Sequence, residues 1–247
     1  MTASEFYART AELVAVLLPE TWRELGPALG AALDRLDTDS GPVVDVGAGT
    51  GEGVRVVAAT LPEAEVLAIE PDPALRTALL AVVGADPDLR QRVSVLDNDL
   101  AGASLPEQLS AILLMNVLGH FSAAERLAVW DLLAARLAPT GRAMLTLYPP
   151  TVPQHVPSTP MAEARIGRRR YTGSATAEPS GPDAVDWEMS YRVMEAGATV
   201  AEFTARDRWV VVTAEQISEE LRPRGLTITE TAPDQFLYMV TRSPTTS

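Results

Sequence analysis

The spacing of hydrophobic residues along this chain alternates between a helical period and short unbroken runs. Near the N-terminus, Phe6, Leu13 and Leu17 fall on one apolar stripe at helical spacing, bordered by polar positions. The pattern predicts one helix over 5–18 and a second helix over roughly 21–36.

From residue 42 onward, short β-branched runs alternate with segments of helical period. The expected strands cover 42–46, 65–69, 92–96, 110–116 and 142–147, and the expected helices cover 52–60, 73–83 and 122–137. In the last of these helices, Ser122 and Glu125 have the spacing of a capping box, and the apolar stripe begins at Ala123. Alternating strands and helices predict an α/β fold, with a doubly wound, mostly parallel sheet between two layers of helices.

The alternation stops after Tyr148. Residues 149–160 contain five prolines and no helical period, which predicts a loop. Residues 184–212 alternate apolar and polar side chains, which predicts an antiparallel β insertion. The chain then returns to the sheet through a helix and two strands, ending in an antiparallel strand, over 213–222, 226–231 and 235–241.

Composition narrows the classes of function. The chain has 247 residues, 47% of them hydrophobic, which is enough for one large core. Its formal net charge of -13 would repel a phosphate backbone, so we expect no nucleic-acid partner.

No apolar run approaches the ~18 residues of a membrane span, and the N-terminus lacks the layout of a secretory signal. We therefore expect a cytoplasmic protein without a membrane partner. The absence of cysteine and the presence of only two histidines argue against a metal site.

The strongest chemical signal is a strand that leads into a helix through glycines at alternate positions, Gly47, Gly49 and Gly51. Glycine permits such a tight turn, and it lets a ligand approach the backbone because it has no Cβ. A dinucleotide site would need the spacing G-x-G-x-x-G, and neither register here supplies it.

The segment from Asp45 to Gly51 resembles motif I of class I S-adenosylmethionine-dependent methyltransferases, D-x-G-x-G-x-G. The resemblance implies a Rossmann-like sheet and a cofactor loop made by Asp45, Gly47, Ala48, Gly49 and Gly51. In this family, the position of Asp45 implies that it orients the loop and the methionyl amino group of the cofactor.

Two later segments resemble further motifs of the family in the same order. Glu70 and Pro71 follow the second expected strand, where a carboxylate accepts hydrogen bonds from the ribose diol. Asp99 and Leu100 resemble the motif whose acid contacts the adenine amino group, because of their distance from the Leu-Pro pair that follows. Asp97 is the alternative for this contact.

The fourth expected strand resembles the family segment that ends in Leu-His-His, with Asn116 in the cofactor site. Gly119 replaces the first histidine, and His120 keeps the place of the second. The resemblance makes His120 either a catalytic base or a structural histidine, and Tyr148 a second candidate base. Tyr7 matches the N-terminal tyrosine that covers the cofactor in many small-molecule members, or else it belongs to the core.

The resemblance also implies one domain with four parts. These are a helical cap over 1–41, a cofactor-binding core over 42–148, a lid or insertion over 149–212, and the C-terminal part of the core over 213–247. Within the insertion, Arg165 and Arg168 to Arg170 form a cluster that suits either a solvated face or an anionic group of the acceptor.

The function implied is transfer of a methyl group from S-adenosylmethionine to an oxygen or nitrogen atom of a small molecule, such as a natural-product intermediate, with S-adenosylhomocysteine as product. A metal-assisted mechanism is not expected, since Asn116 stands where the divalent-metal members have an acid. The alternatives are a repurposed member that binds the cofactor and catalyses a cyclisation or rearrangement, and a non-catalytic scaffold. The sequence is compatible with a homodimer.

Overall fold

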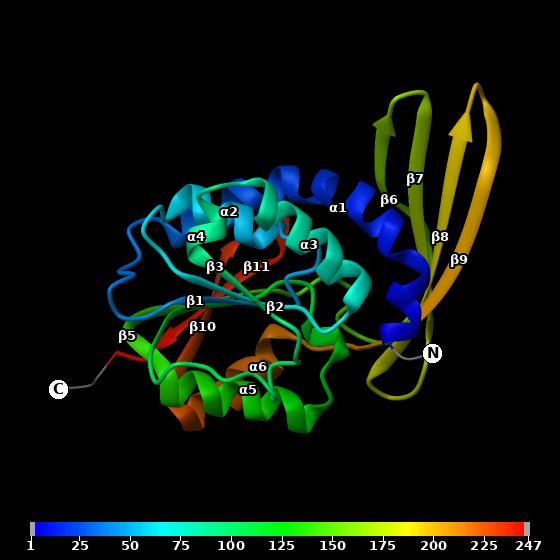
Figure 1. The fold of residues 1–247 in the computed structure, drawn as a ribbon. Helices are drawn as coiled ribbons and strands as arrows, with labels where there is room; N and C mark the ends of the chain where they lie inside the picture. Colours follow the sequence, from blue (N-terminus) through cyan, green and yellow to red (C-terminus); the bar gives the residue numbers. More distant parts are fainter. Residues whose placement is uncertain (1–2, 245–247) are drawn as a thin grey trace.

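The structure is a computed structural model that describes residues 3–244. Its elements follow the chain in the order α1 Ala3–Leu33, β1 Val43–Val46, α2 Glu52–Thr60, β2 Val66–Ile69, α3 Pro73–Ala85, α4 Leu89–Arg92, β3 Val93–Leu96, β4 Leu109–Leu114, η1 Leu118–His120, α5 Ala123–Arg136, β5 Leu137–Thr146, β6 Val156–Ile166, β7 Arg169–Pro179, β8 Ala184–Glu195, β9 Ala198–Val210, α6 Ala214–Leu221, η2 Arg222–Arg224, β10 Leu226–Ala232, η3 Pro233–Gln235 and β11 Leu237–Arg242. The predicted α/β alternation is confirmed (Figure 1).

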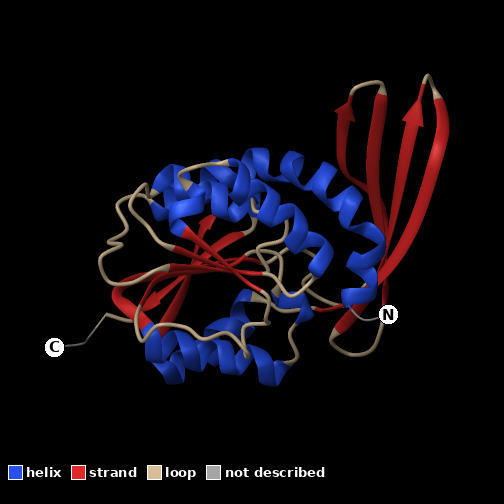
Figure 2. Cartoon of the chain, viewed as in Figure 1, coloured by secondary structure: helices blue, strands red, loops and turns tan. Residues whose placement is uncertain are grey.

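The central sheet has seven strands in the order β10-β11-β5-β4-β1-β2-β3. Strands β1 to β5 pair in parallel, whereas β11 is antiparallel to both of its neighbours, as the sequence predicts for the end of the chain. Helices α1 to α4 cover one face of this sheet, and α5 and α6 cover the other (Figure 2). In a parallel sheet, the carboxyl ends of the strands meet at one edge, so the segments after β1, β2 and β4 lie close together.

Both faces of the central strands are buried, and this explains their unbroken hydrophobic runs. In β4, Leu113 faces the core beneath α1 to α3, and its neighbours Ile112 and Leu114 face the core beneath α5 and α6. All three side chains are fully buried. Each such residue contributes about 1.5–3 kcal/mol through removal from water, so the strands that carry the site segments are well anchored.

The N-terminal segment forms one helix, α1, where the sequence predicted two helices with a break near Pro19. Proline inside a helix removes a hydrogen bond and crowds the preceding turn, so Pro19 disfavours a continuous helix here. The buried positions nevertheless continue with the same four-residue spacing on both sides of the proline. They are Leu13, Leu17, Leu25, Leu29 and Leu33. Burial of this stripe outweighs the local cost of the proline.

The buried face of α5 is rotated relative to the predicted stripe. Ala123 is exposed, and Arg126 is buried beside Trp130. Arg126 is accommodated because Glu220 of α6 accepts hydrogen bonds from its Nε and Nη2 atoms at 2.9 and 2.7 Å. Glu220 also accepts a hydrogen bond from Trp130 Nε1 at 2.7 Å. The capping box of Ser122 and Glu125 is present as predicted.

The insertion is a separate antiparallel sheet of four strands in the order β6-β7-β8-β9. It projects from the body of the molecule, with the turn between β6 and β7 and the turn between β8 and β9 at its outer end (Figure 1). The predicted loop over 149–160 is wrong from Val156 onward, because β6 begins there. Pro157 and Pro160 are compatible with a strand because β6 lies at the edge of the sheet, where a missing N–H group is tolerated. The sequence assigned no strands to the first hairpin.

One face of the insertion packs on the N-terminal half of α1. The contact is apolar, and it joins Leu13 and Leu17 of α1 to Tyr171, Tyr191 and Val193 of the inserted sheet. The alternation predicted for β8 is consistent with this packing, because Tyr191 and Val193 lie on its buried face. The helix therefore connects the two sheets.

We expect Glu220→Gln to lower the free energy of unfolding by about 2–3 kcal/mol, because it leaves the buried Arg126 without a counter-charge. Burial raises the pKa of Glu220, but hydrogen bonds from Arg126 and Trp130 lower it by more, so its net pKa is below the usual range. The carboxylate therefore stabilises the native state above about pH 4, and this contribution is lost as the pH falls through the depressed pKa.

Urea denaturation at pH 7 and pH 3 measures the loss of stability caused by Glu220→Gln, and this loss should be smaller at the lower pH. Glu219→Gln is the matched control, since Glu219 is exposed on the same helix, and it should change stability by less than about 0.5 kcal/mol. Equal stability of Glu220→Gln and the wild type at pH 7 would contradict the expected role of the pair.

Candidate active site

The glycine loop between β1 and α2 adopts a backbone that L-residues with side chains rarely take. Gly47, Gly49 and Gly51 have φ values of +67°, +56° and +98°. The loop is also tied to β2, since Ala48 N donates to Ile69 O at 2.9 Å. A Cβ built on Gly49 would find no atom nearer than Leu18 Cδ2, at 3.8 Å. The space over Gly49 is therefore open enough for a ligand to approach the backbone.

Asp45 lies beneath this loop, buried at the start of α2. A Cβ on Gly53 would lie 2.5 Å from Asp45 Oδ2, so the first turn of α2 fits against the carboxyl group only because residue 53 is glycine. Burial and the charge of Glu70 raise the pKa of Asp45 to about 7. The position of Asp45 suits the predicted task of orienting the loop.

Glu70 connects the loop to the end of β2. Its Oε2 atom accepts a hydrogen bond from Gly49 N at 2.8 Å, and its Oε1 atom accepts one from Asp72 N at 2.8 Å. Burial raises the pKa of Glu70, although these two hydrogen bonds oppose the change. Each carboxylate oxygen keeps a further lone pair, so Glu70 can still accept from a diol. The neighbouring Pro71 is exposed.

The segment after β3 contains both candidates for the adenine contact. Asp97 and Asp99 are exposed, and Leu100 packs on the core between the sheet and α5. Asp99 Oδ1 accepts a hydrogen bond from Gly102 N at 2.8 Å, which orders the turn that follows. The choice of Asp99 over Asp97 stays a prediction.

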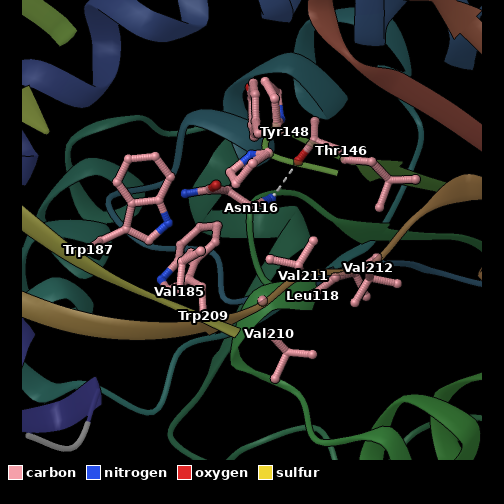
Figure 3. Close-up of a pocket in the computed structure, with 14 residues that line it drawn as sticks. Asn116, Leu118, Thr146, Tyr148, Val185, Trp187, Trp209, Val210, Val211 and Val212 are labelled. Carbon is pink, nitrogen blue, oxygen red and sulfur yellow. Dashed lines mark hydrogen bonds between the residues drawn. The ribbon is translucent and has the colours of Figure 1, made fainter. Parts of the chain in front are cut away.

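Asn116 follows β4 in a left-handed backbone conformation, with φ of +59°. Its N–H donates to Thr146 Oγ1 of β5 at 2.8 Å, which joins the ends of two neighbouring strands (Figure 3). Asparagine is among the non-glycine residues that best tolerate this conformation. The side chain is exposed, and in Figure 3 it points towards Trp187.

A cleft of about 60 Å³ lies between this edge of the sheet and the near ends of β8 and β9. Its walls are mostly apolar and aromatic, with Asn116 and Thr146 as polar side chains (Figure 3). The other lining residues are Leu118, Gly119, Leu147, Tyr148, Pro149, Pro150, Val185, Trp187, Trp209, Val210, Val211 and Val212. The predicted core and the predicted insertion thus contribute to one cleft.

His120 lies at the end of η1, beside this cleft rather than on its wall. Its ring packs edge-on against Trp209 at a centroid distance of 5.1 Å, and it lies 6.4 Å from the ring of Tyr7. His120 Nδ1 is 3.5 Å from Asp207 Oδ2, and Nε2 is buried with no hydrogen-bond partner among residues 3–244. Burial lowers the pKa of His120, and the charge of Asp207 partly offsets this change.

Gly119, the departure from the family pattern, is explained by Trp209. A Cβ on residue 119 would lie 2.5 Å from Trp209 Cε3 and 2.7 Å from Cδ2. Any side chain here would displace the indole ring. The glycine and the tryptophan, 90 positions apart in the sequence, therefore form one steric pair.

The two predicted tyrosines lie in different environments. Tyr148 lines the cleft, is 42% exposed, and has its ring 5.4 Å from that of Phe236. Tyr7 is half-buried on α1 and packs edge-on against Phe6 at 5.1 Å. Burial raises the pKa of both phenols, and for Tyr7 the negative charges of Asp207 and Glu70 add to the effect. Tyr7 therefore lies between the cofactor motifs and β9.

Sequence reasoning missed Asp207, which the structure brings to His120, and it did not foresee that Trp209 reaches Gly119. The sequence does contain one signal for Asp207. In the alternation of the strand, Asp207 falls on the same face as Ala205 and Trp209, and a lone acid on an apolar face is unusual. The arginine cluster lies elsewhere, at the outer turn between β6 and β7, where Arg168, Arg169 and Arg170 pair with glutamates and Arg165 donates to Gly167 O.

Within the part of the chain that the structure describes, no three or more potential metal-ligating side chains come together. None of the described helices combines the length and the apolar character that a membrane span requires.

The comparisons with known proteins agree with this geometry. The sequence model of the family described as Methyltransferase domain matches residues 44–143, which run from β1 into β5 and contain all the predicted cofactor motifs after α1. No curated protein matches the sequence significantly. The similarity to this family therefore covers the part of the chain that holds the glycine loop, Glu70 and Asn116.

Solved structures share this fold across nearly the whole chain. Streptomyces venezuelae DesVI has a TM-score of 0.71 at 16% identity, covering 91% of this chain and 93% of its own. CalS10, an amino pentose methyltransferase from Micromonospora echinaspora involved in calicheamicin biosynthesis, has a TM-score of 0.67 at 18% identity, covering 90% and 92%. The sugar N-methyltransferase KedS8 from Streptoalloteichus sp has a TM-score of 0.66 at 17% identity, covering 89% and 87%. At these identities, the likeness establishes the class I methyltransferase fold.

We expect Gly119→Ala to lower the free energy of unfolding by about 1–3 kcal/mol, because the added methyl group displaces the Trp209 ring. The double variant Gly119→Ala/Trp209→Ala should lose less than the sum of the two single changes, since the clash is then absent. Urea denaturation measures both effects.

Gly84→Ala is the control for the added methyl group. Gly84 lies in α3, and a Cβ there would meet nothing within 4 Å, so this change should be neutral or stabilising. Strict additivity of Gly119→Ala and Trp209→Ala would show that the two residues do not form a steric pair.

Proposed function

We propose that this protein transfers a methyl group from S-adenosylmethionine to an oxygen or nitrogen atom of a small molecule, with S-adenosylhomocysteine as product. The observation that carries the proposal is the open glycine loop fixed by Glu70, which lies at the same sheet edge as an aromatic cleft. When bound, S-adenosylmethionine supplies an already activated methyl group on a sulfonium. The residues therefore need mainly to align the acceptor and exclude water.

The residues present fit this cofactor. The loop from Gly47 to Gly51 offers backbone without obstructing Cβ atoms, and Glu70 keeps free lone pairs for the ribose diol. We assign the adenine contact to Asp99 with Leu100 beside it, and further contacts to Asn116 and Tyr7.

The cleft favours a compact acceptor with at least one ring. Trp187, Trp209 and Tyr148 present aromatic surface, and Asn116 offers both a donor and an acceptor. CalS10 is an amino pentose methyltransferase and KedS8 is a sugar N-methyltransferase, which supports a natural-product sugar or a similar intermediate as acceptor class here. The net charge of -13 argues against a nucleic-acid acceptor.

The base, where the acceptor needs one, is best assigned to His120. Burial lowers its pKa, so the imidazole is neutral and able to accept a proton at neutral pH. Tyr148 stays protonated because burial raises its pKa, which makes it a hydrogen-bond donor to the acceptor. We therefore assign the role of the base to His120 and the role of a hydrogen-bond donor to Tyr148.

Binding of the cofactor is tested without any acceptor. We expect S-adenosylmethionine and S-adenosylhomocysteine each to raise the melting temperature, as a ligand selective for the native state must. Glu70→Ala should weaken binding by about 1–3 kcal/mol through loss of the ribose contacts. Gly49→Val should abolish binding, because its side chain fills the open space over the loop.

Gly167→Val is the matched control for the glycine change. Gly167 has φ of +58°, close to the +56° of Gly49, and a Cβ there meets nothing within 4 Å. The control variant carries the same backbone strain and should still bind the cofactor. No thermal stabilisation of the wild type by either compound at millimolar concentration would overturn the cofactor assignment.

Transfer itself is tested with methyl-labelled S-adenosylmethionine and a panel of amino sugars and hydroxylated ring compounds. We expect label in the small-molecule fraction, and release of S-adenosylhomocysteine in equal amount. Conversion of an acceptor without label transfer would instead favour a rearrangement by a repurposed fold. Label recovered only in nucleic acid would contradict the proposed acceptor class.

A further inference from the structure

We propose that Asp207 of β9 is a positioning residue that orients His120 for proton transfer, so that the inserted sheet completes the active site; this rests on the proposed methyl transfer. Asp207 and Trp209 alternate on one face of β9. In the register of the sheet they stand opposite Trp187 and Val185, the two residues of β8 that line the cleft. This face of the insertion meets η1, where His120 lies.

The carboxylate of Asp207 is held firmly. Only 6% of the residue is exposed. Its Oδ1 atom accepts a hydrogen bond from Arg208 N at 3.0 Å, and its Oδ2 atom accepts one from Trp209 Nε1 at 2.8 Å. The same Oδ2 atom lies 3.5 Å from His120 Nδ1. A carboxylate fixed at this place acts on the imidazole without having to move.

A buried carboxylate is costly unless a donor or a cation compensates it. The guanidinium of Arg208 does not provide this compensation, because it donates to Ser180 O at 2.8 Å. Of the titratable groups around His120, Asp207 comes from β9 and Tyr7 from α1. Tyr7 remains neutral because burial and nearby acids raise its pKa. Asp207 is therefore the group whose charge acts on the ring.

The charge of Asp207 selects one form of the imidazole. An N–H group facing a carboxylate is favoured over a lone pair, so the proton of neutral His120 resides on Nδ1. The lone pair is then on Nε2, the buried atom that has no partner among the described residues. A buried acceptor without a donor is unfavourable in the free protein, and an acceptor ammonium or hydroxyl group would satisfy it. We therefore assign proton transfer to Nε2; because this atom is buried here, the acceptor has to reach it from the neighbouring cleft.

A purely structural role predicts a different outcome on substitution. If Asp207 only anchors Trp209, an asparagine can replace it, because the amide oxygen still accepts from Trp209 Nε1. That oxygen takes the position of Oδ2 and still lies beside His120 Nδ1, but it carries no negative charge. Asp207→Asn therefore separates the anchoring of Trp209 from the orientation of His120.

The test uses the full chain with 15N-labelled histidine and NMR of the imidazole nitrogens. The protein has only two histidines, and exposed His155 serves as the internal reference. We expect wild-type His120 to carry its proton on Nδ1. In Asp207→Asn the preference for the Nδ1 proton should weaken, and the pKa of His120 should fall, because the carboxylate that raised it is gone.

With an acceptor found by label transfer, kcat of Asp207→Asn should fall about tenfold or more, since lost orientation of a reacting imidazole has that scale. The acidic limb of the kcat profile should move to lower pH, and the affinity for S-adenosylmethionine should stay within about threefold. Asp186→Asn is the matched control, because exposed Asp186 lies on β8 on the face opposite Val185 and Trp187. It should change none of these quantities.

Two results would overturn the proposal. One is a wild-type His120 with its proton on Nε2, a measurement that needs no variant to fold. The other is an Asp207→Asn protein in which the pKa of His120, the pH profile and kcat are all unchanged. If no acceptor is methylated, the proposed function fails while the NMR result still decides the role of Asp207. Trp209→Phe removes the indole donor but keeps the carboxylate, and it should retain the Nδ1 proton.

Discussion

The carboxylate of Glu70 is the group on which the cofactor side of this protein depends. It accepts one hydrogen bond from the glycine loop and one from Asp72, so it joins the segments after β1 and β2. Asp72 in turn caps α3 by accepting from Ala74 N and Leu75 N. A single acid at the strand end thus fixes a loop that glycines alone would leave free. The surrounding parallel strands bring these ends to one edge of the sheet.

The acceptor side depends on a contact of a different kind, the packing of an inserted sheet on a single long helix. The C-terminal half of α1 lies against α2 and the central core, and its N-terminal half lies against β6 to β9. Because one helix makes both contacts, the near end of the insertion is held over the carboxyl edge of the main sheet. Trp209 then fits against Gly119, and Asp207 reaches His120.

The central α/β unit was predictable from the sequence because its signals are local. Glycines at alternate positions, the acid after β2 and the capping box of α5 each operate within a few residues, and all appear in the structure. The continuous helix α1 was not predictable, because a proline signals a break while distant packing decides the outcome. The same holds for the buried Arg126, whose burial depends on Glu220, 94 residues away.

The same distinction between local signals and distant packing applies to the residues of the candidate site. Glu70 and Gly49, which the motifs assign to one site, lie in contact, since their positions follow from the ends of adjacent strands. The role of Asp207 could not be predicted from the sequence for two reasons. It belongs to an insertion whose place over the sheet depends on α1, and a lone acid in a strand is usually solvated. The glycine at position 119 was recognised as a departure, but its cause lies in Trp209, on a strand that no local pattern places nearby.

Electrostatics connects the two halves of the site. Burial and, after it, the charge of Glu70 raise the pKa of Asp45 to about 7, and the charges of Asp207 and Glu70 add to the effect of burial on the pKa of Tyr7. The carboxylates in the described part of the site therefore place negative charge where little water screens it. A bound cation offsets this unfavourable charge. On the function we propose, a sulfonium donor carries the needed positive charge and its demethylated product lacks it, so the same carboxylates would favour the donor over the product. The neutral His120 fits this pattern, because an imidazolium at that place would compete with the donor for the same negative field.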